Sequence, residues 1–139
     1  MLHDFWGYNI SINGSHKSYR PLAILTLRWN YALSGGLSPY SMHLVNIILH
    51  SVVSVLVLKV VSLMFTATSL QDSRSSFPYP RASLLSGVLF AVHPVHTESV
   101  VANVGRADLI CALFFFLAML VYIKLCSRNS KNPLHVYWP

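Results

Sequence analysis

Three long apolar runs follow one another along the chain, separated by polar stretches. The first, 44–65, exceeds the roughly 20 apolar residues that a helix needs to cross about 30 Å of hydrocarbon. The third, 109–125, is slightly shorter, and the second, 82–95, is interrupted at His93-Pro94. This pattern predicts three membrane-spanning helices.

A shorter element precedes the first span. Residues 21–37 open with Pro21, which is favoured in the first turn of a helix. Arg28 and Asn30 break the apolar run that follows. Because the segment is too short and too polar to span, we predict an amphipathic helix that lies on the membrane surface.

The composition favours the same class of protein. Hydrophobic residues make up 54% of the chain and charged residues only 10%, against about 25% charged in an average soluble domain. The net charge is +6, but the basic residues are scattered, so we expect no nucleic-acid partner. Cys111 and Cys126 fall in one predicted helix, about 22 Å apart, which is too far for a disulfide.

Basic residues set the predicted orientation, because the membrane side richer in Lys and Arg is usually cytoplasmic. The richer side carries Arg74, Arg81, Lys124, Arg128 and Lys131. The opposite, lumenal side carries Lys17, Arg20, Arg28 and Arg106. N-glycosylation sequons at Asn9 and Asn13, usable only in the lumen, agree with this orientation.

The predicted fold class is therefore an all-α, multi-pass membrane helical bundle. Its parts are a lumenal loop with an interfacial helix (1–41), a first span (42–65), a cytoplasmic loop (66–81), a second span (82–95), a lumenal turn (96–108), a third span (109–125) and a cytoplasmic tail (126–139).

Polar residues gather on the predicted lumenal face. Arg and Lys neutralise phosphate, and a carboxylate or His can move a proton. We therefore expect this face to bind a charged headgroup. The residues form three clusters, Ser15-His16-Lys17-Ser18-Tyr19-Arg20, His93-Pro94-Val95-His96-Thr97-Glu98 and Gly105-Arg106-Ala107-Asp108, and a helical stripe of His43, Asn46, His50 and Ser54 starts at the same face.

Several of these residues also have plainer explanations. Asp108 is suited to cap the third span, and Arg106 to anchor a helix end at the headgroups. His50 is suited to hydrogen-bonded packing. Two histidines with a misplaced Glu98 make a weak metal site, so we expect no metal.

The chain resembles a known family, the transmembrane and tetratricopeptide-repeat-containing (TMTC) proteins. The stretch 80–85 is most similar to the fourth vertebrate paralogue. The motifs that carry the resemblance are Asp4-Phe5-Trp6-Gly7, Ser15-His16-Lys17-Ser18-Tyr19-Arg20-Pro21-Leu22, His43-Leu44-Val45-Asn46, Leu89-Phe90-Ala91-Val92-His93-Pro94-Val95-His96-Thr97-Glu98 and Gly105-Arg106-Ala107-Asp108.

The resemblance implies a multi-pass protein of the endoplasmic reticulum membrane with a fold similar to GT-C glycosyltransferases. The implied reaction transfers mannose from dolichyl-phosphate mannose to Ser or Thr of cadherin-type domains. It needs no cofactor besides this lipid donor. The implied partners are the lipid bilayer, the donor and the acceptor proteins.

The sequence departs from the family pattern. The family's first transmembrane helix, the paired aspartates after it and the tetratricopeptide repeats are not found here, so we expect a fragment with no catalytic residue of its own. Whether the chain alone is an enzyme is left open, and the alternative is a non-catalytic membrane subunit or regulator produced by truncation. We assign donor binding to His16, Lys17, Arg20, His93 and Arg106, and a supporting role to Asp4, His96, Glu98 and Asp108.

Overall fold

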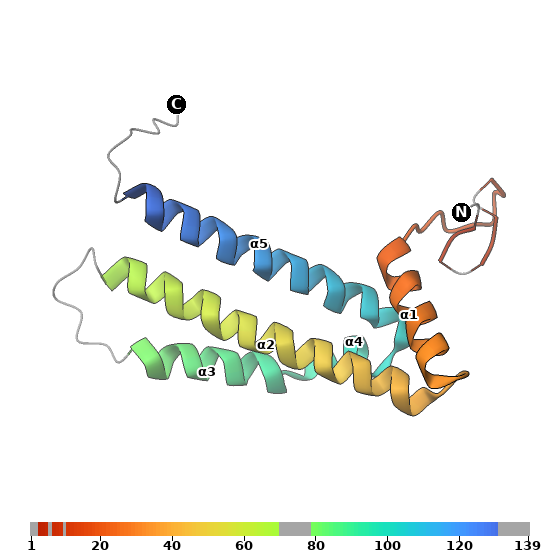
Figure 1. Ribbon diagram of the computed structural model, residues 1–139, viewed down its shortest axis with the longest axis horizontal. Coiled ribbons are helices and arrows are strands. Elements are labelled where there is room, and N and C mark those ends of the chain that lie inside the picture. Colours follow the sequence, from red (N-terminus) through yellow and green to blue (C-terminus); the bar gives the residue numbers. More distant parts are fainter. Residues whose placement is uncertain (1–2, 6, 10, 70–78, 131–139) are drawn as a thin grey trace.

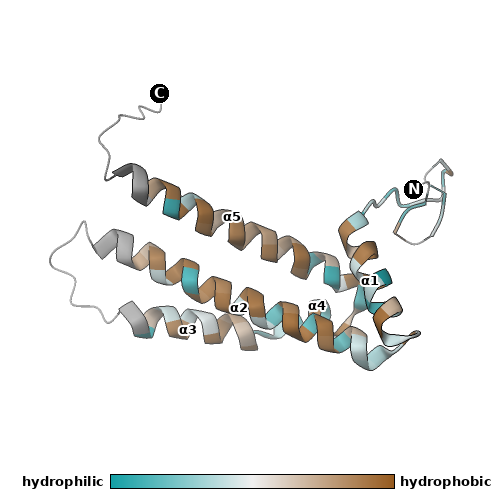
Figure 2. Cartoon of the chain, viewed as in Figure 1, coloured by the Kyte–Doolittle hydropathy of each residue, from teal (hydrophilic) through white to brown (hydrophobic). Residues whose placement is uncertain are grey.

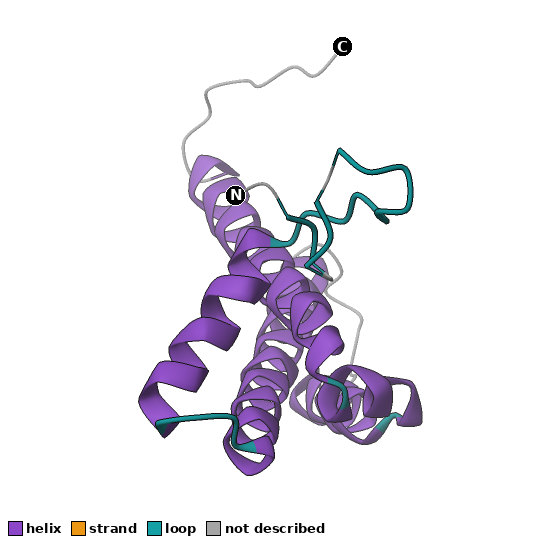
Figure 3. Ribbon diagram, turned by 90° about the vertical axis from the view of Figure 1, so that its right-hand side faces the viewer, coloured by secondary structure: helices purple, strands orange, loops and turns teal. Residues whose placement is uncertain are grey.

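The computed structural model of the chain describes residues 3–5, 7–9, 11–69 and 79–130. Every regular element in those ranges is a helix (Figure 3), which confirms the all-α prediction. The elements are α1 (Pro21–Ser34), α2 (Pro39–Ser69), α3 (Tyr79–Val92), the 3-10 turn η1 (Pro94–His96), α4 (Thr97–Val101), the 3-10 turn η2 (Asn103–Gly105) and α5 (Arg106–Ser130).

The helices form a bundle that is capped at one end. Helices α2, α3 and α5 run along the long axis, and α1 lies across the end where α5 begins (Figure 1). The N-terminal loop stands beside α1, outside the bundle (Figure 3). Hydrophobic residues cover the long helices, whereas hydrophilic residues gather where α1, α4 and the start of α5 meet (Figure 2). We call this region the α1 end.

Within the residues that the structure describes, two segments are long and apolar enough to cross a membrane. They are Pro39–Phe65 and Asn103–Cys126, with mean hydropathies of 2.3 and 2.5. A third span is available if the bent pair Arg81–Val92 and Pro94–Val101 is counted as one. The prediction of a helical membrane bundle is confirmed.

The helix at the place of the predicted second span, 82–95, is α3, which runs from Tyr79 to Val92. Pro94 has no backbone N–H and interrupts the hydrogen-bond ladder of α3. His93 caps the turn that follows, since its Nδ1 accepts a hydrogen bond from the backbone two residues on at 3.2 Å. The chain then resumes as helix, bent by 44°, and reaches Val101. Part of the predicted turn 96–108 is therefore helical, because the chain forms a second helical segment after the proline.

Helix α2 supplies most of the buried apolar core and lies between α3 and α5. Gly87 of α3 faces Leu58 of α2, and a Cβ at Gly87 would lie 3.0 Å from the Leu58 Cβ. Small residues allow such close packing between membrane helices. The buried residues of α2 are Met42, Asn46, Val53, Leu56, Val57 and Val60.

Helix α1 is well delimited but makes few buried contacts. Pro21 lies in its first turn, and Gly35, with φ of 66°, caps its end in the left-handed conformation that glycine adopts without a Cβ clash. Only Ala23 and Asn30 are buried, whereas Leu33 is 89% exposed. A helix with so little buried surface depends on a small number of contacts for its orientation.

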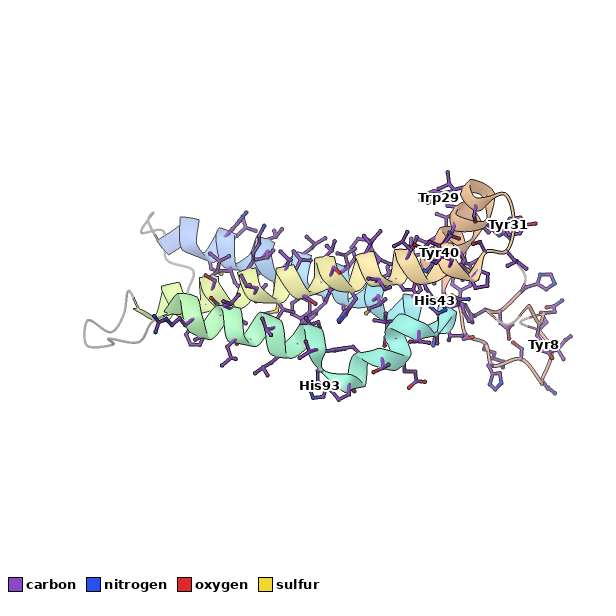
Figure 4. All side chains as sticks on the ribbon, turned by 90° about the horizontal axis from the view of Figure 1, so that it is seen from below. Tyr8, Trp29, Tyr31, Tyr40, His43 and His93 are labelled. Atoms are coloured by element: carbon purple, nitrogen blue, oxygen red, sulfur yellow. The ribbon has the colours of Figure 1, made fainter. Side chains whose placement is uncertain are left out.

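Exposed aromatic side chains surround the α1 end. Trp29, Tyr31 and Tyr40 are 60%, 52% and 78% exposed and lie together in Figure 4. Trp and Tyr are enriched where a membrane meets water. Their position is compatible with an interfacial location for α1, which stays a prediction.

Candidate functional site

The N-terminal loop is organised around a buried carboxylate. Asp4 is 2% exposed, and its Oδ1 and Oδ2 accept hydrogen bonds from the Tyr8 backbone N–H (2.8 Å) and the Ser15 hydroxyl (2.6 Å). The Ser15 hydroxyl also accepts a hydrogen bond from the Lys17 backbone N–H at 3.1 Å. Asp4 therefore supports the loop internally, and the supporting role at the donor site stays a prediction.

This loop leads directly into a basic segment. The side chains of His16 and Lys17 are exposed, and Lys17 has a left-handed φ of 52°. The guanidinium of Arg20 lies 5.4 Å from the centre of the Phe5 ring, within cation–π range. Phe5 is tied to the same segment by a hydrogen bond from its N–H to the Ser18 carbonyl at 2.8 Å. The loop thus holds Arg20 at the start of α1.

A groove of about 580 Å³ runs between α1 and the first half of α5. Its walls are apolar except at Arg20. An apolar groove with one cation suits an amphiphile that has an anionic head and a hydrocarbon chain. The lining residues are Arg20, Pro21, Leu22, Ala23, Ala107, Ile110, Cys111, Phe114 and Phe115.

Arg106, the first residue of α5, is completely buried at the α1 end. Its Nε donates a hydrogen bond to Asn46 Oδ1 at 2.8 Å. Its Nη2 donates to Asn30 Oδ1 (3.1 Å) and the Met42 carbonyl (2.9 Å), and its Nη1 donates to the Thr26 carbonyl (3.5 Å). We call these five residues the arginine cluster. The guanidinium expected to meet a donor phosphate is instead enclosed by protein oxygens, because α1 and α2 both fold over it.

The two asparagines extend the arginine cluster. Asn46 Nδ2 donates hydrogen bonds to the Val100 carbonyl at 3.1 Å and the Ala102 carbonyl at 3.4 Å. Asn30 Nδ2 donates to the Ser41 hydroxyl at 3.1 Å. Each asparagine thus accepts a hydrogen bond from Arg106 and donates one or two others. Together the two side chains connect α1, α2, α5, α4 and the residue that follows α4.

A second polar cluster lies at the bend after α3, with His93 about midway along the bundle and away from the loop that carries Tyr8 (Figure 4). The His96 ring packs against those of Phe90 and His50, at centroid distances of 4.2 and 5.2 Å. His50 Nε2 lies 3.1 Å from the Ala91 carbonyl oxygen. These contacts agree with the packing role considered for His50.

The structure therefore divides the predicted site residues into separate groups. Arg20 lines the groove on the α1 side. Arg106 does not line the groove, but the next residue, Ala107, lines it on the α5 side. His93 and His96 belong to the bend, and Glu98 and Asp108 are exposed. Sequence reasoning missed the role of Asn30, whose only signal was a polar residue that interrupts an apolar run.

Cys111 and Cys126 are both free, as their predicted separation required. Cys111 lies in the wall of the groove, among apolar residues. Thiols of this kind usually act as small hydrophobic side chains. No disulfide role is therefore assigned to either residue.

Comparison with known proteins gives close relatives. The chain is 53% identical to human protein O-mannosyl-transferase TMTC4 and 56% identical to its mouse counterpart, over 98% of this chain and 19% of each relative. It is 46% identical to mouse protein O-mannosyl-transferase TMTC2 over 99% of this chain and 15% of the relative. These similarities confirm the predicted family resemblance. No protein-family profile and no solved structure matches the chain.

Proposed function

We propose, from its similarity to one segment of the TMTC protein O-mannosyl-transferases, that this chain forms part of the membrane region of such an enzyme. The reaction moves mannose from dolichyl-phosphate mannose to Ser or Thr of cadherin-type acceptor domains at the endoplasmic reticulum membrane. By the family resemblance, we expect the catalytic carboxylates in another segment of the full-length relatives. The part assigned to this chain is binding of the lipid-linked donor.

The observation that carries this proposal is the groove between α1 and α5 with Arg20 at the start of α1. Dolichyl-phosphate mannose combines an anionic phosphate with a long apolar chain. Arg20 is placed to meet the phosphate, while residues such as Ile110 and Phe114 offer apolar surface to the chain. The exposed His16 and Lys17 lie in the same segment, where Lys17 adds positive charge and His16 adds a hydrogen-bonding ring near the headgroup.

Replacing Arg20 with alanine in a full-length relative that carries the matching arginine should weaken use of the donor by about 10- to 150-fold. The estimate follows from about 1.5–3 kcal/mol for a hydrogen bond to a charged group. The measurement is mannose transfer at subsaturating donor, normalised to the amount of folded protein.

Arg28→Ala is the matched control, because Arg28 is an exposed cation on the same helix that does not line the groove. We expect it to transfer mannose at close to the wild-type rate. Wild-type transfer by the Arg20→Ala variant, at normal protein level, would refute the donor-site assignment.

The N-terminal loop offers a test of the proposed lumenal orientation. Asn9 and Asn13 are both exposed, but the hydroxyl of Ser15, which completes the Asn13 sequon, is buried against Asp4. Ser11, which completes the Asn9 sequon, is exposed. If the loop folds before modification, Asn9 is the better acceptor.

We therefore expect a glycan shift in microsomes that endoglycosidase removes. Asn9→Gln should abolish it, and Asn13→Gln should leave it in place. Cleavage of the loop by protease added outside intact microsomes would show a cytoplasmic loop and contradict the orientation.

A further inference from the structure

The arginine cluster is the polar connection between α1 and the long helices. Arg106 of α5 donates hydrogen bonds to two oxygen atoms of α1, the Thr26 carbonyl and Asn30 Oδ1. It donates to two more in α2, the Met42 carbonyl and Asn46 Oδ1. None of these four acceptors is a carboxylate, so their effect is to fix geometry around a buried cation and not to neutralise it.

Helix α1 needs such a connection because so little of it is buried. Its buried residues are Ala23 and Asn30, and Asn30 owes its position to the hydrogen bonds with Arg106 and Ser41. Arg20 precedes Asn30 by ten residues, which is about 15 Å along the helix axis. A tilt of about 10° at Asn30 would therefore move Arg20 by about 2.6 Å, enough to break a hydrogen bond.

We propose that Arg106 is a positioning residue, which holds α1 so that Arg20 faces the groove on α5. This inference rests on the proposed function, because it assigns Arg106 an effect on the donor through Arg20. It replaces the direct phosphate contact that the sequence suggested for Arg106. Ala107, the residue after Arg106, lines the groove on the α5 side. The arginine cluster therefore fixes the positions of both α1 and α5, which form the two walls of the groove.

An arginine is required for this role, and a lysine is not equivalent. The guanidinium places its donors in a planar fork, and the arginine cluster uses Nε and both Nη atoms at once. A lysine ammonium at the same position keeps the charge but offers one nitrogen, which cannot reach Asn46 and both α1 acceptors together. Arg106→Lys therefore tests geometry while retaining the charge.

The experiment measures KM for dolichyl-phosphate mannose and kcat per folded molecule in a full-length relative with matching residues. For Arg106→Lys we expect KM to rise about 10-fold, with kcat within about threefold of wild type, since lost uniform binding raises KM alone. Arg28→Lys, the same exchange at an exposed position of α1, should change neither constant. If Arg106→Lys does not accumulate, Asn30→Ala is the substitute, because it removes the α1 hydrogen bonds to Arg106 and Ser41 while leaving the hydrogen bonds from Arg106 to α2.

A double variant separates positioning from an independent effect. If Arg106 acts through Arg20, then Arg20→Ala with Arg106→Lys should have about the same KM as Arg20→Ala alone, whereas independent residues would multiply their effects. Multiplied effects would overturn the inference, and so would less folded protein at an unchanged KM. An unchanged KM in Arg20→Ala alone would instead refute the donor site itself.

Discussion

Asn46→Leu is expected to destabilise the helix bundle by about 1.5–3 kcal/mol, the range for a lost hydrogen bond to a charged group. Leucine has the same branched side-chain skeleton as asparagine, so the loss comes mainly from hydrogen bonding. The Arg106 Nε would lose its acceptor in a completely buried site. The Val100 and Ala102 carbonyls would also lose the hydrogen bonds from Asn46 Nδ2, and the Ala102 carbonyl would keep only the one from the Gly105 backbone N–H. Asn46 is 0% exposed, so water cannot readily replace these contacts.

The measurement is thermal unfolding in detergent of a full-length relative with the matching residues. Asn103→Leu is the control, because Asn103 is an exposed asparagine in the adjoining turn and should tolerate the same exchange. Adding Arg106→Met to Asn46→Leu should cost about 1–3 kcal/mol less than Arg106→Met costs alone, because both substitutions remove the same hydrogen bond between Arg106 and Asn46. Strictly additive losses in the double variant would contradict the arginine cluster.

Gly105→Ala is expected to cost about 3 kcal/mol or more, which is the upper range for overpacking. A Cβ at this position would lie 2.4 Å from the Ser99 Cα and 2.7 Å from the Ser99 carbonyl oxygen. Both atoms are backbone, so the clash cannot be relieved by rotating a side chain. Any displacement would also move Arg106, the next residue, and with it the contacts to α1 and α2.

The same unfolding measurement tests this substitution. Gly36→Ala is the matched control, because a Cβ there would meet no atom within 4 Å, and we expect a change of no more than about 0.5 kcal/mol. Wild-type stability of Gly105→Ala would show that α4 and the start of α5 are not packed as closely as described.

The elements of this protein could be predicted from sequence because their signals are local. A span must contain enough consecutive apolar residues to cross the hydrocarbon layer, and α2 and α5 satisfy that requirement by themselves. Pro21 and Gly35 delimit α1, and Pro94 marks the bend after α3. The family resemblance could likewise be recognised from sequence, because its motifs are short stretches of consecutive residues.

The candidate site depended on contacts between distant segments, which only the tertiary structure decided. Asn46 and Asn30 precede Arg106 by 60 and 76 residues, and no local pattern indicates that three such side chains meet. The sequence correctly indicated that Arg20 and Arg106 belong to the same end of the bundle. It could not show that one lines a groove and the other is enclosed, because burial of a guanidinium depends on how α1 and α2 pack over it.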